Sequence, residues 1–332
     1  MKINPRDLKY QASLRLVGLS CKPNKLVLIH TAVAVAVTML VSLMNLFLNG
    51  QVAQTGGLEG MQVKALWETT RSLAETAQTF LLPFWNVGIF YVVLRFARGQ
   101  EAEKRDLGAG FAKFTKVLTM LLWQFLLYLG AVLVIFYIAS VLIAFASNTD
   151  SLNAALGPIA QQLQEKPELL DDPAFLRSIP LTSILPAVAL PLILSVIVAV
   201  VVLGFLIYRL RLSSFFVMDN PELGGLNAVR RSFRSMKGNM LAMIKLDLSF
   251  WWYYGLQALL IVVSSASLVL TLLGIPQQGE LPAVGFQFLY GAGLLVLAYF
   301  KGAYVQTTYA LAYEEICANG GSASASPRLR AK

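Results

Sequence analysis

The chain has 332 residues, of which 57% are hydrophobic and 14% charged, and its formal net charge is +9 at pH 7. Soluble globular domains carry about 25% charged residues, so this composition excludes an ordinary soluble protein. His30 is the single histidine, which excludes metal clusters built from several histidines.

Six apolar stretches are each long enough to cross a bilayer, because a hydrocarbon core of about 30 Å needs about 20 helical residues. The first is too long and starts too late for a cleaved signal peptide, and no small-residue cleavage site follows it. The sequence therefore predicts an all-α, six-span membrane domain over residues 26–316. Its expected spans lie near residues 26–49, 79–96, 117–147, 182–208, 246–274 and 283–311.

Lysine and arginine are distributed unevenly between these spans. Of 27 such residues, 22 fall in the two terminal segments and in the connections after the second and fourth spans. Basic residues concentrate on the cytoplasmic side of membrane proteins. The distribution predicts a multi-pass protein of the cytoplasmic membrane with both termini inside. Four basic residues are predicted outside, namely Lys64, Arg71, Lys166 and Arg177.

The positive net charge does not indicate nucleic-acid binding, because the topology alone accounts for these residues. Basic clusters next to membrane spans attract anionic head groups, with about 1 kcal/mol per residue near the surface. The expected partners are therefore membrane lipids of anionic type, or a membrane-protein partner, and no nucleic acid.

The clearest amphipathic segment comes before the fifth span. Asp219 or Asn220 is expected to cap a helix that starts at Pro221 and ends before Gly238. An interfacial helix of this kind places its basic face toward head groups. Its expected apolar face carries Leu226, Val229, Phe233 and Met236, and its lipid- or partner-facing basic patch carries Arg230, Arg231, Arg234 and Lys237.

Two weaker copies of this pattern come before the first and third spans, at Arg6–Ser20 and Lys104–Lys116. They indicate a loose threefold repeat of interfacial helix and membrane hairpin, although selection for positive charge inside would produce the same likeness. Residues 1–25 are thus expected to form a cytoplasmic amphipathic segment. The tail over residues 317–332 is rich in glycine and serine and is expected to be disordered. Short surface helices are expected within the outer connection at 148–181.

Five polar side chains near the ends of spans are candidates for chemistry, namely His30, Asp247, Lys301, Glu314 and Glu315. His30 is expected to be an interfacial side chain near the start of the first span. Asp247 and Lys301 form a possible intramembrane polar site, because ionisable residues in spans mark transport pathways. The structural alternative pairs Asp247 with Lys245, Lys301 or a neighbouring arginine, and lets Lys301 reach the inner surface.

Prolines interrupt two predicted spans, at Pro83 in the second and at Pro186 and Pro191 in the fourth. Broken helices can bind substrates in transporters, but ordinary kinks are also tolerated in membrane helices. The sequence lacks the hydrolase, phosphate-binding and zinc-protease motifs. We expect no catalytic residue, metal or cofactor, and no enzymatic activity.

The stretch around the fifth span is similar to a known family. The similarity is specific over residues 210–260 and looser over spans three, four and six, and the chain departs from the family in its long segment at 148–181. The residues that carry the resemblance are Asp219-Asn220-Pro221-Glu222, Met236-Lys237-Gly238-Asn239 and Leu246-Asp247-Leu248-Ser249-Phe250 before Trp251. With them the chain resembles the uncharacterised bacterial integral membrane family called domain of unknown function 975. The resemblance implies a polytopic helical protein and brings no activity.

Two functions are consistent with these features. The first is a non-enzymatic membrane protein that engages anionic lipid or a membrane partner through its basic cytoplasmic face. The alternative is a small-solute transporter or permease with a site between spans four, five and six.

Overall fold

A computed structural model describes residues 4–54, 57–146, 157–162, 164–165, 181–266 and 281–319. These residues form helices and connections, and no strand occurs among them. The expectation of an all-α protein is confirmed.

The chain divides into two compact units, which are considered separately. Unit 2 covers Trp123–Arg209 and contains most of α5 (Phe114–Ala146) and α8 (Leu181–Leu210). Unit 1 covers Met1–Leu122 and Leu210–Lys332. Its helices are α1 (Pro5–Val17), α2 (Pro23–Gln54), α3 (Gly57–Ala97), η1 (Lys104–Gly108), α4 (Ala109–Ala112), α9 (Ser213–Asp219), α10 (Gly225–Ser235), α11 (Met240–Leu248), α12 (Trp251–Ser264), α14 (Leu281–Leu297), the π-helical turn η3 (Ala298–Gly302) and α15 (Ala303–Asn319).

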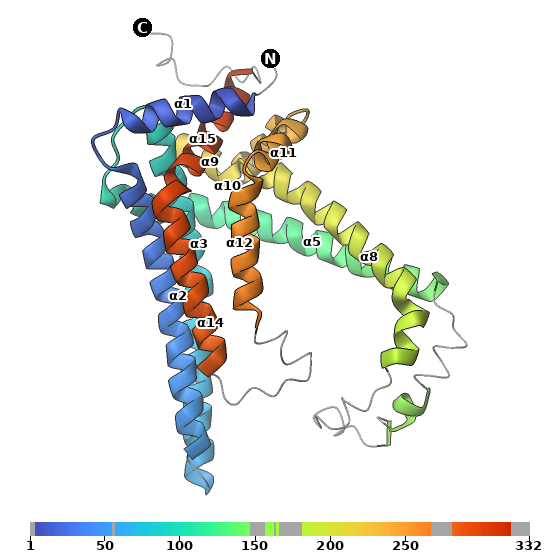
Figure 1. Cartoon of the computed structure of the whole chain (residues 1–332). Helices are drawn as coiled ribbons and strands as arrows, with labels where there is room; N and C mark the ends of the chain where they lie inside the picture. Colours follow the sequence, from blue (N-terminus) through green and yellow to red (C-terminus); the bar gives the residue numbers. More distant parts are fainter. Residues whose placement is uncertain are drawn as a thin grey trace. The chain divides into compact units, whose positions relative to one another are not determined.

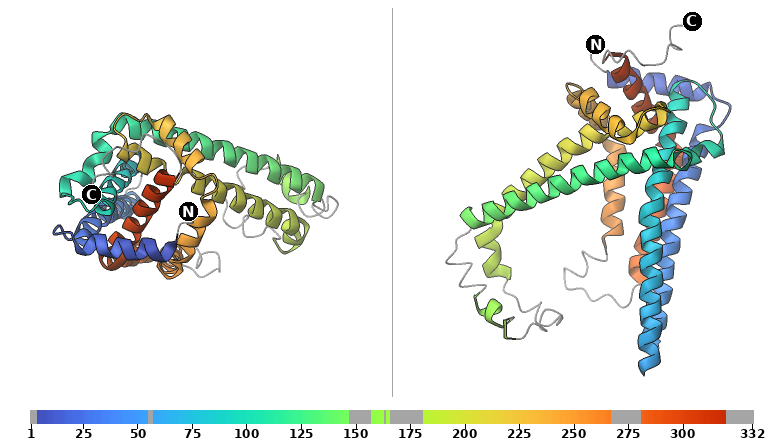
Figure 2. Two further views of the ribbon diagram at one scale, coloured as in Figure 1. Left: turned by 90° about the horizontal axis from the view of Figure 1, so that it is seen from above. Right: turned by 180° about the vertical axis from the view of Figure 1, so that it is seen from behind.

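Long helices of unit 1 pack side by side. α2 contacts both α3 and α14, and α14 also contacts α12, as the opposite views show (Figures 1 and 2). Helix α1 lies across one end of this bundle and packs on α15 (Figure 1). The short helices α9, α10 and α11 gather at the same end (Figure 1).

Five helices are long and apolar enough to cross a membrane, and a bent pair makes a sixth candidate. Five of the predicted spans therefore correspond to continuous helices. The fifth prediction, 246–274, corresponds in its described part to a bent pair of helices, because α11 and α12 meet at an angle of 74°. Asp247 thus belongs to the helix before the bend, and residues 267–280 lie outside the described part of the chain. The continuous candidates cover Pro23–Phe47, Lys64–Ala97, Phe114–Leu142, Ala189–Asp219 and Val284–Asn319.

The prolines do not break the helices in which they occur. Helix α3 continues through Pro83, and α8 continues through Pro186 and Pro191. The Ser195 hydroxyl donates a hydrogen bond of 2.7 Å to the Pro191 carbonyl. The broken span is the fifth, and it contains no proline.

Large apolar side chains face outward along the spans of unit 2. Phe136 and Tyr137 on α5 are 72% and 71% exposed, and Val200 on α8 is 67% exposed. A soluble protein rarely leaves so many large apolar side chains in water, whereas lipid tails solvate them. Unit 2 therefore presents the surface expected of membrane-embedded helices.

Short helices occur in each predicted interfacial segment. Helix α1 lies within residues 1–25, η1 and α4 come before α5, and α10 comes before α11. The interfacial segment before α5 consists of a 3-10 turn followed by one α-helical turn rather than a longer helix. The predicted repeat is therefore irregular.

A close backbone contact joins α3 to the η1–α4 segment. A Cβ atom at Gly88 would collide with the Leu107 carbonyl, and one at Gly110 would collide with the Phe84 carbonyl. Glycine is required at both positions because a backbone atom fills the space of a side chain.

Two predicted segments fall partly outside the described residues. Residues 157–162 and 164–165 of the outer connection are helical, and the remainder of 148–180 is not described. Helix α15 extends to Asn319, two residues past the predicted start of the tail at 317, and residues 320–332 are not described.

Candidate functional site

Helix α15 is the central buried element of unit 1. Its segment from Val305 to Tyr313 is almost entirely buried, and its small residues allow α1 and α3 to approach closely. Tyr309 and Tyr313 lie four residues apart and therefore share one face of the helix. This face, with Glu314 next to it, takes part in two polar clusters.

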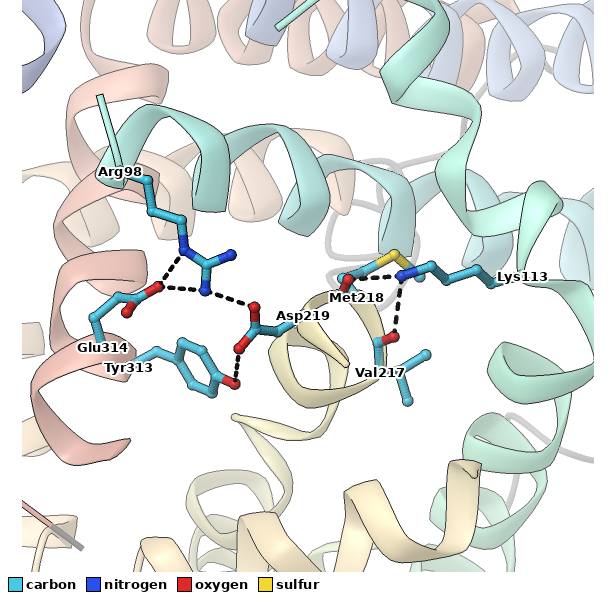
Figure 3. A network of polar contacts seen from close by, with 7 residues as sticks. All are labelled: Arg98, Lys113, Val217, Met218, Asp219, Tyr313 and Glu314. Carbon is cyan, nitrogen blue, oxygen red and sulfur yellow. Dashed lines mark hydrogen bonds and ion pairs between the residues drawn. The ribbon is translucent and has the colours of Figure 1, made fainter. Parts of the chain in front are cut away.

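The first cluster centres on Arg98, just after the end of α3 (Figure 3). Its Nε donates to Glu314 Oε1 over 2.7 Å, and its Nη2 lies 2.5 Å from Asp219 Oδ1. The Tyr313 hydroxyl donates to the other Asp219 oxygen over 3.0 Å. One guanidinium therefore joins α3, α9 and α15. We call Arg98, Asp219, Tyr313 and Glu314 the Arg98 cluster.

Lys113 binds backbone carbonyls in the last turn of α9 (Figure 3). Its Nζ donates to the Met218 carbonyl over 2.7 Å and lies 3.5 Å from the Val217 carbonyl. A cation at the last turn of a helix is favourable because the helix dipole is negative there. Burial lowers the pKa of Lys113, and the charge of Lys116 lowers it further.

Arg98 remains charged in this setting. Burial of its guanidinium opposes the charge, but the hydrogen bonds and charges of Asp219 and Glu314 prevail and raise its pKa. Partly buried ion pairs of this kind are costly to break, because the remaining charge then lacks a partner. The cluster is therefore suited to holding three helices in one arrangement.

The second cluster surrounds Asp247 on α11. Arg211 Nη1 lies 2.6 Å from Asp247 Oδ2, and the Tyr309 hydroxyl donates to Asp247 Oδ1 over 2.5 Å. The Tyr254 hydroxyl lies 2.6 Å from that of Tyr309. The Arg211 guanidinium also lies over the Tyr309 ring, 4.3 Å from its centre. Asp247 therefore pairs with a neighbouring arginine, as the structural alternative expected.

The basic patch lies on a helix that starts later than expected. Helix α10 begins at Gly225 with Gly224 as its N-cap, so neither Asp219 nor Asn220 caps it. Asp219 instead ends α9, where its carboxylate binds Arg98. The cap prediction is wrong because the segment Asn220–Gly224 forms a turn, which separates Asp219 from α10.

The side chains of α10 differ in exposure. Val229 and Met236 are buried, and Leu226 and Phe233 are partly buried. Arg230, Arg234 and Lys237 are exposed, and Arg231 is partly exposed. Lys237 lies just beyond the last residue of the helix.

His30 is not an interfacial side chain. It is 7% exposed, its ring stacks on Trp85 at a centroid distance of 5.4 Å, and its Nε2 lies 3.2 Å from the Trp85 carbonyl. Trp85 Nε1 donates in return to the His30 carbonyl over 2.9 Å. The interfacial interpretation is wrong because α3 covers this side of α2.

Lys301 lies in the π-helical turn η3, and its side chain is exposed. Its Nζ lies 5.8 Å from the centre of the Tyr304 ring. Asp247 is paired with Arg211 rather than with Lys301 in the ion pairs of the described residues. The two members of the predicted intramembrane site therefore have different environments.

Sequence patterns did not indicate that Arg98, Lys113, Tyr309 and Tyr313 are parts of a site. One signal was present, because Asp219 and Glu314 are acids in segments that are predicted to be cytoplasmic and that carry most of the basic residues. Acids on such a face are expected to pair with some of its cations, and here they share Arg98.

The helices, their lengths and their exposed apolar faces define a polytopic, all-α membrane protein. The chain belongs to the family described as protein of unknown function (DUF975), whose sequence model matches residues 1–320. No curated protein and no solved structure matches the chain.

Proposed function

We propose that this protein is a non-enzymatic component of the bacterial cytoplasmic membrane that engages anionic lipid through the basic face of α10. The observation that carries the proposal is the division of α10 into a buried apolar face and an exposed basic face. A helix of this kind lies in the membrane interface, and its cations attract anionic head groups.

The clusters around α15 support a scaffold role for the same end of the bundle. The carboxylates of Asp219, Glu314 and Asp247 are each bound by arginine. Carboxylates held in this way are suited to fixing helices rather than to proton transfer. In the proposed orientation this end, and both chain termini, face the cytoplasm.

Lipid enrichment around the full-length protein tests this proposal. Protein extracted into nanodiscs from bilayers of phosphatidylglycerol and phosphatidylcholine is expected to carry more phosphatidylglycerol than the bulk membrane. The variant Arg230→Gln/Arg234→Gln should lose most of this enrichment, because both side chains are exposed on one face of α10. Added salt should weaken the enrichment of the wild type, since charges are screened over roughly 8 Å at physiological ionic strength.

A matched control is Lys104→Gln/Arg105→Gln, which removes two exposed cations from η1. This control is expected to keep most of the enrichment, because η1 has no extended basic face. Equal losses in the two variants would contradict the assignment to α10. Enrichment of a membrane protein in place of the lipid would identify a protein partner instead.

A polar recess inside the bundle favours a second candidate function, a permease for small uncharged solutes. The recess has a volume of about 200 Å³ and is lined by side chains of α2, α3, α12, α14, η3 and α15. Gln306 Oε1 is buried and has no hydrogen-bond partner in the described part of the chain. An unpaired buried carbonyl costs about 1–3 kcal/mol, so a solute that donates a hydrogen bond would be stabilised there. The hydrogen-bonding residues of its lining are His30, Thr31, Asn86, Tyr253, Gln257 and Gln306.

This recess involves the first, second, fifth and sixth spans, whereas the permease site was predicted between spans four, five and six. Swelling of proteoliposomes in a glycerol gradient tests it. A permease should accelerate swelling relative to protein-free vesicles, and Ala34→Leu should abolish the acceleration because residue 34 lines the recess. Ala258→Leu on an exposed part of α12 is the control. Swelling at the protein-free rate would argue against transport of such solutes.

A further inference from the structure

Lys301 is a cation within a candidate membrane span, Val284–Asn319. No carboxylate in the described residues lies within 4.0 Å of its Nζ, in contrast to Arg98 and Arg211. It also occurs in a π-helical turn, a rare distortion that is frequent at functional sites. A charge in this position is expected to find an anion from outside the chain.

Lys301 borders a recess of about 540 Å³ between α1, the start of α2 and η3. The recess has a polar part, with Ser13, Asn24 and Lys301, and an apolar part, with Leu16, Val17 and Phe300. Such a combination fits an amphiphilic molecule that has both an anionic group and a hydrocarbon chain. A soluble anion would leave the apolar part of the recess exposed.

The position of α1 indicates that this recess lies at the surface of the bilayer. Tyr10, Leu14 and Val17 are spaced along one face of α1 and are 65%, 55% and 86% exposed. The opposite face of α1 buries Leu8 and Ala12 against the bundle. Arg6, Asp7, Gln11 and Arg15 are exposed as well, so the outer surface of α1 is both polar and apolar. A helix with such a surface that lies across the bundle end is expected at the level of the head groups (Figure 1).

The depth of Lys301 in the last span agrees with this position. Lys301 follows Val284 by 17 residues, which corresponds to about 25 Å of helix. A hydrocarbon core is about 30 Å thick, so the ammonium group reaches the inner head-group level. Both α1 and η3 therefore place the recess where phosphates and the first acyl carbons meet.

We propose that this recess binds one anionic glycerophospholipid, with its phosphate at Lys301 Nζ and an acyl chain along Val17 and Phe300. The proposal rests on the cytoplasmic orientation of the proposed function but uses a different surface from α10. It assigns a discrete, stoichiometric lipid site, whereas α10 attracts a diffuse population of lipids.

Native mass spectrometry of the full-length protein in mild detergent tests the site. With added phosphatidylglycerol, the wild type should retain one tightly bound lipid, and with phosphatidylcholine it should retain much less. Lys301→Gln should lower the phosphatidylglycerol occupancy about tenfold, since a charge-assisted phosphate contact is lost. Lys301→Arg should preserve the occupancy, and Lys104→Gln should also preserve it as a matched exposed cation.

Phe300→Ser tests the acyl part and should reduce retention without changing the charge. Arg230→Gln/Arg234→Gln should keep the single lipid, so failure of the α10 proposal and failure of this one are distinguishable. Displacement of the lipid by excess glycerol phosphate would overturn the proposal in favour of a soluble phosphate ester. Unchanged occupancy in Lys301→Gln, or equal retention of phosphatidylcholine by the wild type, would also overturn it.

Discussion

Replacing Arg98 by glutamine is expected to lower the free energy of unfolding by about 3 kcal/mol, because it leaves two carboxylates without their shared cation. Asp219 and Glu314 both lie within 2.6 Å of Arg98 Nη2, and each side chain is 22% exposed. The loss should appear as a lower melting temperature of the full-length protein in detergent. Helices α3, α9 and α15 would then lack their common link.

The control for Arg98 is Arg105→Gln. Arg105 pairs with Glu103 in η1, but their side chains are 81% and 67% exposed. Exposed pairs of this kind contribute at most about 1 kcal/mol, so the control should barely change the melting temperature. The triple variant Arg98→Gln/Asp219→Asn/Glu314→Gln should recover part of the lost stability, since it removes the unpaired carboxylates. A melting temperature of Arg98→Gln equal to that of the wild type would show that the cluster does not hold the helices.

Sequence patterns predicted the features of this fold that depend on local periodicity. Long apolar runs predicted helices long enough to cross a membrane. The spacing of Val229 and Met236 indicates which side of α10 is buried, and both residues are buried. Both patterns follow from the geometry of a single helix whose surroundings are apolar in some places and aqueous in others. They need no information about other parts of the chain.

The bend in the fifth span could not be predicted in this way. The bend lies next to the polar residues Asp247 and Ser249, but polar residues also occur at the ends of continuous spans and do not by themselves indicate a bend. The bend exposes the Ser249 carbonyl, and Lys9 of α1 donates to it over 2.5 Å. The Lys9 ammonium also lies 4.0 Å from the centre of the Phe250 ring. A contact across 240 residues of sequence therefore stabilises the bend.

The Arg98 cluster could not be predicted from the sequence for a similar reason. Arg98 is 121 residues from Asp219 and 216 residues from Glu314. Asp219 precedes a proline and a glutamate, a local pattern that is typical of a helix start. The long-range ion pair determined its role instead, because a partly buried carboxylate requires a cation.

Replacing Gly88 by alanine is expected to destabilise the protein by about 3 kcal/mol, although alanine is the better helix former. The new Cβ would collide with the Leu107 carbonyl and lie 3.4 Å from the Gly110 nitrogen. Both are backbone atoms, so no side chain can rotate away to make room. Thermal unfolding of the full-length protein in detergent measures the loss.

The control is the same substitution at Gly255 in α12, where a Cβ meets nothing within 4 Å. Gly255→Ala should raise the stability by roughly 0.5–1 kcal/mol, because the unfolded chain loses conformational freedom at this position. The same chemical change is thus expected to have opposite signs at two helical glycines. A Gly88→Ala variant as stable as the wild type would contradict the close contact between α3 and the η1–α4 segment.

The effect of Gly88→Ala should extend to the Arg98 cluster. Displacement of Leu107 and Gly110 from α3 would carry Lys113 with them, because α4 ends at the preceding residue. Lys113 holds the last carbonyls of α9, and the neighbouring Asp219 binds Arg98. In the double variant Gly88→Ala/Lys113→Met, the loss of unfolding free energy should therefore be smaller than the sum of the losses in the two single variants. Full additivity would show that the glycine contact and the cluster stabilise the bundle independently.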